Sequence, residues 1–202
     1  MDSDAALLAS WRGGDQRAGR ALFARHVDGV SRFFFSKVSS GVDDLVQRSF
    51  LGLLERSAEI PSGVVVRAYL FGIARNLLLR RFRDEYRDGR YIDELTTSVA
   101  DLGITPSVLH DQRKQLALLY SALQALPLDL QIAVELFYWE ELAAGEIGSV
   151  LGVPEGTVRS RLRRARELLA QQLQTLGPGL GEPSIEDIER WARELRDRIG
   201  RP

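Results

Sequence analysis

The chain has 202 residues, no cysteine and a net charge of −1, with 45% hydrophobic and 27% charged residues. These values are typical of a folded globular protein of one or two domains. The lack of cysteine excludes disulfides, cysteine-bound metals and thiol catalysis. The longest apolar runs are far too short to cross a bilayer, and the acidic N-terminus does not resemble a signal peptide. We therefore expect a cytoplasmic protein without membrane insertion.

The sequence follows a helical period almost throughout, and it contains no convincing alternating run of the kind that predicts strands. An all-α protein is therefore expected. The predicted helices span residues 4–38 with a break at 13–14, then 42–57, 66–87, 108–125, 129–139, 143–151, 154–174 and 184–199. Residues 88–107 mix Gly, Thr, Ser, Asp and Pro without a period, which is typical of a flexible linker between two helical domains. A second break at 177–181 precedes the last helix.

The basic residues are unusual in kind and in placement. Twenty-five of the 27 are arginine, and Lys37 and Lys114 are the only lysines. Arginine suits phosphates and guanine edges, although a GC-rich genome would produce the same bias. Residues 67–90 contain seven arginines against three acids, and residues 154–175 contain five against two. These two basic stretches on a nearly neutral chain indicate contact with nucleic acid.

Residues 142–166 carry the pattern of a helix-turn-helix. A short apolar helix ends at Gly152, which can adopt the left-handed conformation of a helix end. Pro154 suits the first position of the next helix. The buried stripe of that helix is predicted to be Val158, Leu162, Ala165 and Leu169, which leaves its arginines on the outer faces. In this motif the second helix enters the major groove of DNA.

Several segments together resemble one family. The stretch VPEGTVRSRLRRARELL, preceded by EIGSVLG, resembles region 4 of bacterial sigma factors, most closely those of the extracytoplasmic-function (ECF) group. DDLVQRSFLGLLER and VRAYLFGIARNLLLRRFR resemble region 2 of the same family, and the order and spacing of the segments agree with it. The resemblance implies a region 2 domain at 1–87, a linker at 88–111, a region 4 helix-turn-helix domain at 112–175 and a C-terminal extension at 176–202.

The resemblance also implies site residues. Polymerase binding is expected from Asp44, Gln47 and Phe50. Reading of the melted minus-ten element is expected from Tyr69, Arg75, Asn76, Arg80 and Arg81, with a capture loop near 60–65. Reading of the minus-thirty-five element is expected from Gly156, Thr157, Arg159, Ser160, Arg163 and Arg164. Phe50 and Tyr69 fit a core position equally well, and Arg48 stands where the family commonly has an acid.

The implied function is that of an alternative sigma factor, which binds core RNA polymerase and directs it to promoter DNA. An anti-sigma factor is a candidate further partner. The sequence predicts no cofactor, no metal site and no enzymatic activity, because His26 and His110 are the only histidines and no Gly-rich phosphate loop is present. The alternatives are a helix-turn-helix regulator that binds duplex DNA without polymerase, and an adaptor that has lost DNA reading.

The C-terminal segment lies outside the resemblance. Ile185, Ile188, Leu195 and Ile199 lie on one face of the predicted helix 184–199, with Trp191 beside them. An isolated helix of this length is marginal in water, so this face is expected to pack on something. Two interpretations remain: a helix that caps the domain, or a regulatory tail that docks on region 2 or region 4 with 177–181 as its hinge.

Overall fold

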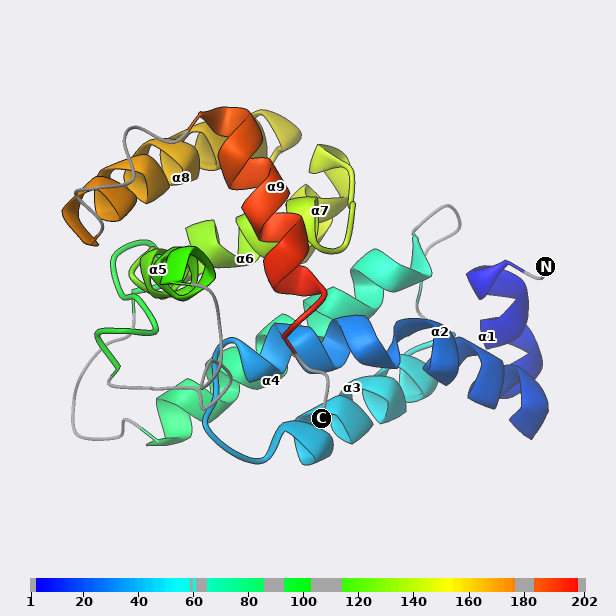
Figure 1. The fold of residues 1–202 in the computed structure, drawn as a ribbon. Coiled ribbons are helices and arrows are strands. Elements are labelled where there is room, and N and C mark those ends of the chain that lie inside the picture. Colours follow the sequence, from blue (N-terminus) through cyan, green and yellow to red (C-terminus); the bar gives the residue numbers. More distant parts are fainter. Residues whose placement is uncertain are drawn as a thin grey trace.

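The computed structural model describes residues 3–58, 60, 65–85, 93–102, 114–176 and 184–199, and every regular element among them is a helix (Figure 1). The all-α prediction is therefore confirmed. The helices are α1 (Asp4–Arg12), α2 (Gln16–Phe35), α3 (Val42–Glu55), α4 (Val66–Glu85), α5 (Lys114–Gln124), α6 (Leu128–Tyr138), α7 (Ala144–Leu151), α8 (Glu155–Leu176) and α9 (Ile185–Arg196). We call α1–α4 the N-terminal half and α5–α8 the C-terminal half.

Local signals fix the ends of these helices. The side chain of Ser3 accepts a hydrogen bond from the amide of Ala6 at the start of α1, and Asp15 caps α2 by accepting from Arg17 and Ala18. Such caps satisfy amides that a helix leaves without a partner. The break expected at residues 13–14 therefore separates α1 from α2.

The core of the N-terminal half is aromatic. Phe33 of α2 and Phe71 of α4 are buried with their ring centroids 5.9 Å apart, and Phe34 meets Phe33 edge to face. Helix α3 adds Leu45 and Leu53, both almost fully buried. The predicted inner faces of α2, α3 and α4 thus pack against one another.

The C-terminal half surrounds α6, in which Leu128 to Leu136 are all buried. Helices α7 and α8 form the predicted helix-turn-helix, and Gly152 between them has a left-handed backbone with φ of 69°. The predicted stripe of α8, which consists of Val158, Leu162, Ala165 and Leu169, is buried. The interpretation of residues 142–166 as a helix-turn-helix is therefore confirmed.

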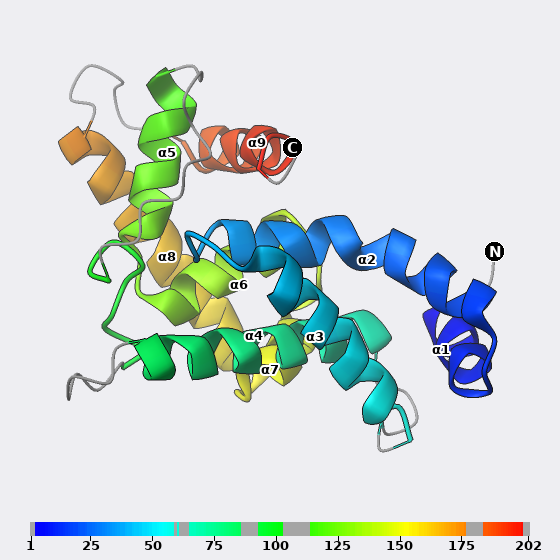
Figure 2. The ribbon, with the colours of Figure 1, turned by 90° about the horizontal axis from the view of Figure 1, so that it is seen from below.

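The two halves pack directly against each other, with α4 against α7 and α2 beside α6 (Figure 2). The described part of the expected linker, residues 93–102, is also held in place. The amide of Leu128 donates to the carbonyl of Thr97 at 3.0 Å, and the amide of Ala100 donates to the carbonyl of Gln124 at 3.1 Å. The sequence predicted two domains but not this contact between them.

Helix α9 packs on α5 and α6, with Ala192, Leu195 and Ile199 buried. Its N-terminus is a capping box: the side chain of Ser184 accepts from the amide of Asp187, and the side chain of Asp187 accepts from the amide of Ser184. The expected helical start at 108–113, the hinge at 177–181 and most of the capture loop at 60–65 lie outside the described residues.

The turn of the helix-turn-helix needs glycine at a second position. A Cβ on Gly148 would lie 2.6 Å from the carbonyl oxygen of Val153, whose amide donates to the carbonyl of Gly148. Gly148→Ala should therefore cost about 1–3 kcal/mol of stability through overpacking and lower the melting temperature in calorimetry. Gly72→Ala is the control, because nothing lies within 4 Å of its added Cβ and alanine favours the helix. Equal melting temperatures for the two variants would contradict this account of the turn.

Candidate nucleic-acid interface

The expected minus-thirty-five residues form an exposed face on α8. The side chains of Arg159, Arg163 and Arg164 are 73%, 79% and 59% exposed. Their ion pairs with Glu155 and Glu167 lie within the same helix and at the surface, where such pairs contribute little stability. These guanidinium groups can therefore exchange their partners for phosphates or guanine edges at small cost.

The first turn of α8 completes this face. Gly156 and Ser160 are exposed, Thr157 is half-buried, and the hydroxyl of Ser160 donates to the carbonyl of Thr157 at 2.8 Å. Amides in the first turn of a helix lack helical acceptors and attract anions. The six expected residues are thus brought together on one side of one helix.

The expected minus-ten residues of α4 divide into two groups. Asn76 and Arg80 are exposed, while Tyr69 and Arg81 are half-buried. Arg81 donates to Glu85 at 2.8 Å and reaches the hydroxyl of Ser40. These four side chains remain accessible from the surface.

Arg75 is different because carboxylates of other segments cover it. Its guanidinium is 13% exposed and pairs with Asp129 of α6 at 3.0 Å and with Glu94 of the 93–102 segment. Asp129 also accepts from Arg161 of α8 at 2.8 Å. Burial raises the pKa of Glu94, and the charge of Arg75 opposes that rise. An expected DNA-binding residue is thus occupied by acids from the C-terminal half and the linker.

The expected polymerase residues lie along α3. Asp44 and Gln47 are exposed, and Asp44 forms only a surface pair with Arg48 at 3.5 Å. Phe50 is buried, and its ring lies tilted against that of Phe23 with the ring centroids 4.7 Å apart. Phe50 therefore supports this face rather than forming its outer surface.

Sequence reasoning missed an apolar part of the α3 face. Leu51 is 46% exposed and Phe23 of α2 is 40% exposed. Leu51 follows Gln47 by one helical turn, so the two side chains share a face with Asp44. The same helical spacing in the sequence could have identified Leu51. Together these residues form a mixed polar and apolar surface of the kind that binds another protein.

A fully buried ion pair joins the two halves. Lys37 follows α2 and pairs with Glu135 of α6; their side chains are 0% and 2% exposed. The lysine ammonium also donates to the carbonyl of Phe33 at 2.8 Å and to the hydroxyl of Ser36 at 2.9 Å, so all three of its donors are used. Glu135 accepts further from Gln131. Burial lowers the pKa of Lys37 and raises the pKa of Glu135, and their attraction opposes both shifts.

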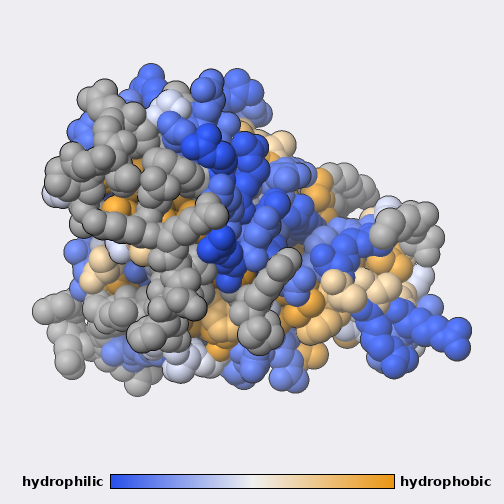
Figure 3. All heavy atoms as spheres, in the orientation of Figure 1, coloured by the Kyte–Doolittle hydropathy of each residue, from blue (hydrophilic) through white to orange (hydrophobic). Residues whose placement is uncertain are grey.

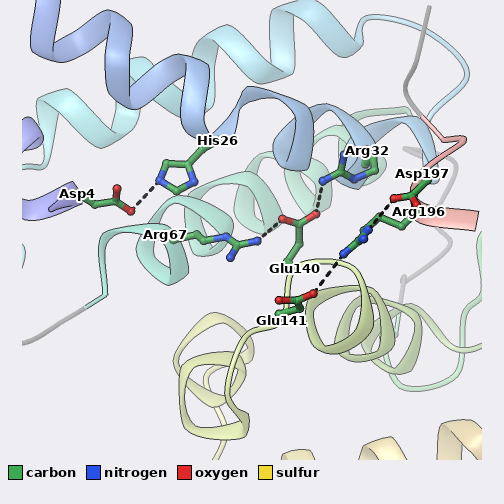
Figure 4. A network of polar contacts seen from close by, with 8 residues as sticks. All are labelled: Asp4, His26, Arg32, Arg67, Glu140, Glu141, Arg196 and Asp197. Atoms are coloured by element: carbon green, nitrogen blue, oxygen red, sulfur yellow. Dashed lines mark hydrogen bonds and ion pairs between the residues drawn. The ribbon is translucent and has the colours of Figure 1, made fainter. Parts of the chain in front are cut away.

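A second interdomain cluster surrounds Glu140, in the turn after α6 (Figure 4). Its carboxylate accepts from Arg32 of α2 at 3.0 Å and from Arg67 of α4 at 2.5 Å. A cleft of about 530 Å³ adjoins these groups and is also lined by residues of α1 and by the end of α9. In the cleft His26 contacts Asp4 at 2.7 Å, and burial lowers the pKa of His26 although Asp4 opposes this.

The end of the C-terminal helix α9 lies beside this cleft. Glu189 accepts from Tyr138 at 3.3 Å, and Arg196 donates to Glu141 at 3.3 Å. The band that α9 occupies on this face of the molecule is strongly hydrophilic (Figure 3). Of the expected tail residues, Leu195 and Ile199 are buried, whereas the side chains of Ile185, Ile188 and Trp191 lie outside the description.

Among the described residues, no helix combines the length and apolarity needed to cross a membrane. Within the same ranges, no three His, Asp or Glu side chains are arranged to hold a metal ion.

Comparison with known proteins finds two matching families. Residues 22–88 match sigma-70 region 2, and residues 116–169 match sigma-70, region 4. The chain is 34% identical to the RNA polymerase sigma factor HrpL of Pseudomonas syringae pv. syringae, over 76% of this chain and 86% of that protein. It is 31% identical to the ECF RNA polymerase sigma factor SigM of Mycobacterium tuberculosis, over 88% of both chains.

Two solved structures of sigma-type proteins also resemble the fold of this chain. The chain superposes on CnrH, solved in complex with the cytosolic domain of CnrY, with a TM-score of 0.63 and 28% identity, covering 86% of this chain and 99% of that one. It superposes on the sigma factor RpoE of Bartonella quintana, solved with the anti-sigma factor NepR, with a TM-score of 0.55 and 23% identity over 75% and 90% of the two chains. The second likeness concerns the fold alone.

The packing of α9 predicts a loss of thermal stability when the C-terminal extension is removed. Deletion of residues 182–202 exposes the surface that Ala192, Leu195 and Ile199 cover, and burial of each Leu or Ile contributes about 1.5–3 kcal/mol. The melting temperature should fall by several degrees. Leu195→Ala in the full chain should reproduce part of this loss, whereas Arg193→Ala, at an exposed position, should not. An unchanged melting temperature together with higher transcription would contradict the capping role and favour a regulatory tail.

Proposed function

We propose three contacts for this chain, which belongs to the sigma-70 family, in its extracytoplasmic-function group, and is a promoter-specific transcription initiation factor. Helix α8 reads the minus-thirty-five element, α4 holds the melted minus-ten strand and α3 docks on core RNA polymerase. The observation that carries the proposal is the arginine face of α8, which is exposed while the opposite stripe of the helix is buried. A helix of this kind can insert into the major groove with its polar side toward the bases.

In the minus-thirty-five role, Arg159, Arg163 and Arg164 supply bidentate contacts to guanine or single contacts to phosphate. Ser160 and Thr157 add hydroxyl contacts, and the amide of Gly156 meets a phosphate at the helix N-terminus. The assignment follows the chemistry of the α8 face and the match of residues 116–169 to region 4.

In the minus-ten role, α4 offers Tyr69 for stacking, Asn76 for base edges, and Arg80 and Arg81 for the backbone. Single strands are held by this combination of aromatic faces and basic groups. Arg75 joins this set only after its pairs with Asp129 and Glu94 are broken.

Reading both promoter elements requires the two halves to separate. By their names the elements lie about 25 base pairs apart, which is ~85 Å at 3.4 Å per base pair. Helices that pack together, as α4 and α7 do, have axes only about 8–10 Å apart. The closed arrangement is therefore the state of the chain away from the promoter.

The polymerase contact is proposed for the α3 face of Asp44 and Gln47, extended by Leu51 and Phe23. The chain is proposed to act in the cytoplasm, where polymerase is found, and to leave nucleotide addition to the core enzyme. Because a sigma-type neighbour was solved with an anti-sigma factor, an anti-sigma factor is a proposed further partner.

In vitro transcription with core polymerase and genomic fragments tests the function as a whole. The proposal predicts specific transcripts that depend on the chain, and only weak binding to duplex DNA by the chain alone, because few phosphate contacts give weak, salt-sensitive binding. Tight sequence-specific binding in a gel shift without polymerase would instead support a conventional helix-turn-helix regulator.

The arginine face of α8 can be tested on a promoter that in vitro transcription has identified. Arg164→Ala should remove a base contact of about 1–3 kcal/mol and lower transcription from the cognate promoter about 5- to 150-fold, with core binding unchanged. Arg190→Ala is the control, since it removes an exposed arginine from α9 and leaves α8 intact. A loss of core binding in the α8 variant would contradict the assignment.

A substitution in the proposed polymerase contact of α3 should weaken polymerase binding rather than promoter recognition. Leu51→Asp places a charge in the proposed contact and should weaken binding to core polymerase about tenfold, as for a contact residue worth about 1–2 kcal/mol. Leu95→Asp is the matched control, because Leu95 is 56% exposed and lies on the segment between the halves. Affinity measured by fluorescence anisotropy should separate the two, and equal affinities would remove Leu51 from the interface.

A further inference from the structure

Helix α8 carries an arginine at each edge of its exposed face, and the two arginines have different partners. Arg161, at one edge, is 15% exposed and pairs with the carboxylate of Asp129 at 2.8 Å. Arg166, at the other edge, is half-buried, and its Nε donates to the hydroxyl of Tyr138 at 3.0 Å. The charge of Arg161 is thus balanced by its partner, whereas a neutral hydroxyl leaves the charge of Arg166 unbalanced.

Arg166 continues the row of proposed DNA contacts on α8. It follows Arg163 by three residues and Arg159 by seven, a spacing that places all three on one side of a helix. Among the described residues, the remaining N–H groups of Arg166 have no hydrogen-bond partner. A guanidinium that is bonded at one nitrogen can still donate from the others to a phosphate oxygen. Phosphate contacts fix the position of a protein on the duplex without reading its sequence.

Tyr138, near the end of α6, is placed to support this guanidinium. It is 7% exposed, and a buried hydroxyl needs hydrogen-bond partners. Its O–H donates to Glu189 of α9 at 3.3 Å, which leaves the lone pairs of the oxygen for Arg166. Burial raises the pKa of Tyr138 although the charge of Arg166 opposes that rise, and the hydroxyl therefore keeps the proton that it donates.

Glu189 extends this row of hydrogen bonds into the C-terminal extension, which lies outside the match of residues 116–169 to region 4. A hydroxyl that donates to a carboxylate is polarised, and its oxygen becomes a stronger acceptor for the next donor. Helix α9 is itself held on α5 and α6, where Leu195 and Ile199 are buried. The extension therefore acts on an arginine of α8 through a side chain of α6.

We propose that the C-terminal extension takes part in DNA binding: Arg166 is a phosphate contact of α8, and Tyr138 and Glu189 are positioning residues that hold its guanidinium for that contact. This role adds to the stabilising role of α9. It rests on the proposed function, because it assumes that α8 lies against duplex DNA. The contact needs a backbone phosphate but no particular base.

The phosphate contact is tested with the holoenzyme on a promoter fragment, by measuring the affinity at a series of salt concentrations. Arg166→Ala should reduce the slope of log affinity against log salt by about 1, the value for one lost phosphate contact. It should also weaken binding by the same factor on a fragment with an altered minus-thirty-five element. Arg193→Ala, which removes an exposed arginine from α9, should leave both quantities unchanged. An unchanged slope for Arg166→Ala, or a loss of core binding instead, overturns the contact.

The positioning role is tested with variants that keep Arg166. Tyr138→Phe and Glu189→Ala should each weaken promoter binding several-fold with the salt slope preserved, because the charge that meets the phosphate remains. Glu189→Gln keeps an oxygen that can accept the same bond and should bind like wild type, as should Glu186→Ala at an exposed position of α9. In the Arg166→Ala chain, Tyr138→Phe should cause no further loss. If the two losses add instead, Tyr138 supports the fold rather than Arg166, and the positioning role is wrong.

Failure of this contact is distinguishable from failure of the proposed function. If the chain supports no promoter-specific transcription with core polymerase, the proposed function is wrong. The salt slope of the free chain on an arbitrary duplex at low salt then still decides the contact, because the release of counterions requires no specific sequence. A slope reduced by about 1 in Arg166→Ala supports the phosphate contact, and equal slopes for this variant and wild type overturn it.

Discussion

The buried pair of Lys37 and Glu135 is the contact from which the arrangement of the two halves follows. It lies where α2 meets α6, and the charges on either side continue its pattern through Asp129 and Glu140. A lysine suits this position because its ammonium has three donors and the site offers three acceptors. An arginine, with five donors, would leave some unpaired. In a chain with only two lysines, one of them therefore stands at the place that arginine fits least.

Because of this contact, the two surfaces proposed to bind DNA are not equally exposed to solvent. Arg159, Arg163 and Arg164 of α8 are exposed in the closed chain, whereas Arg75 of α4 is covered by Asp129 and Glu94. The proposed minus-thirty-five face is thus exposed in the closed chain, and we propose that opening completes the minus-ten face. Helix α9 lies on α5 and α6 and adds Arg196 beside Glu141, so the C-terminal extension stabilises the half that carries Asp129, Glu135 and Glu140.

The sequence predicted what depends on local periodicity. The helices, the helix end at Gly152 and the buried stripe from Val158 to Leu169 all follow from spacing within a few turns. It did not predict that Glu135 is buried, because an acid within an apolar helix is expected to face solvent, and its partner lies 98 positions away in the chain. The pairing of Arg75 with Asp129 was missed for the same reason. Leu51 was missed although its spacing from Asp44 and Gln47 was visible.

We propose that the chain is closed when it is free and open on its promoter. Because the chain has no cysteine, two cysteines can be introduced for spin labels without first removing native ones. Labels at Ala9 in α1 and Gln171 in α8, both exposed, report the distance between the halves by double electron–electron resonance. We expect a single distance in the free chain, set by the closed packing of the halves, and a distance tens of ångströms longer in the complex with core polymerase and promoter DNA. The same distance in both samples would contradict it.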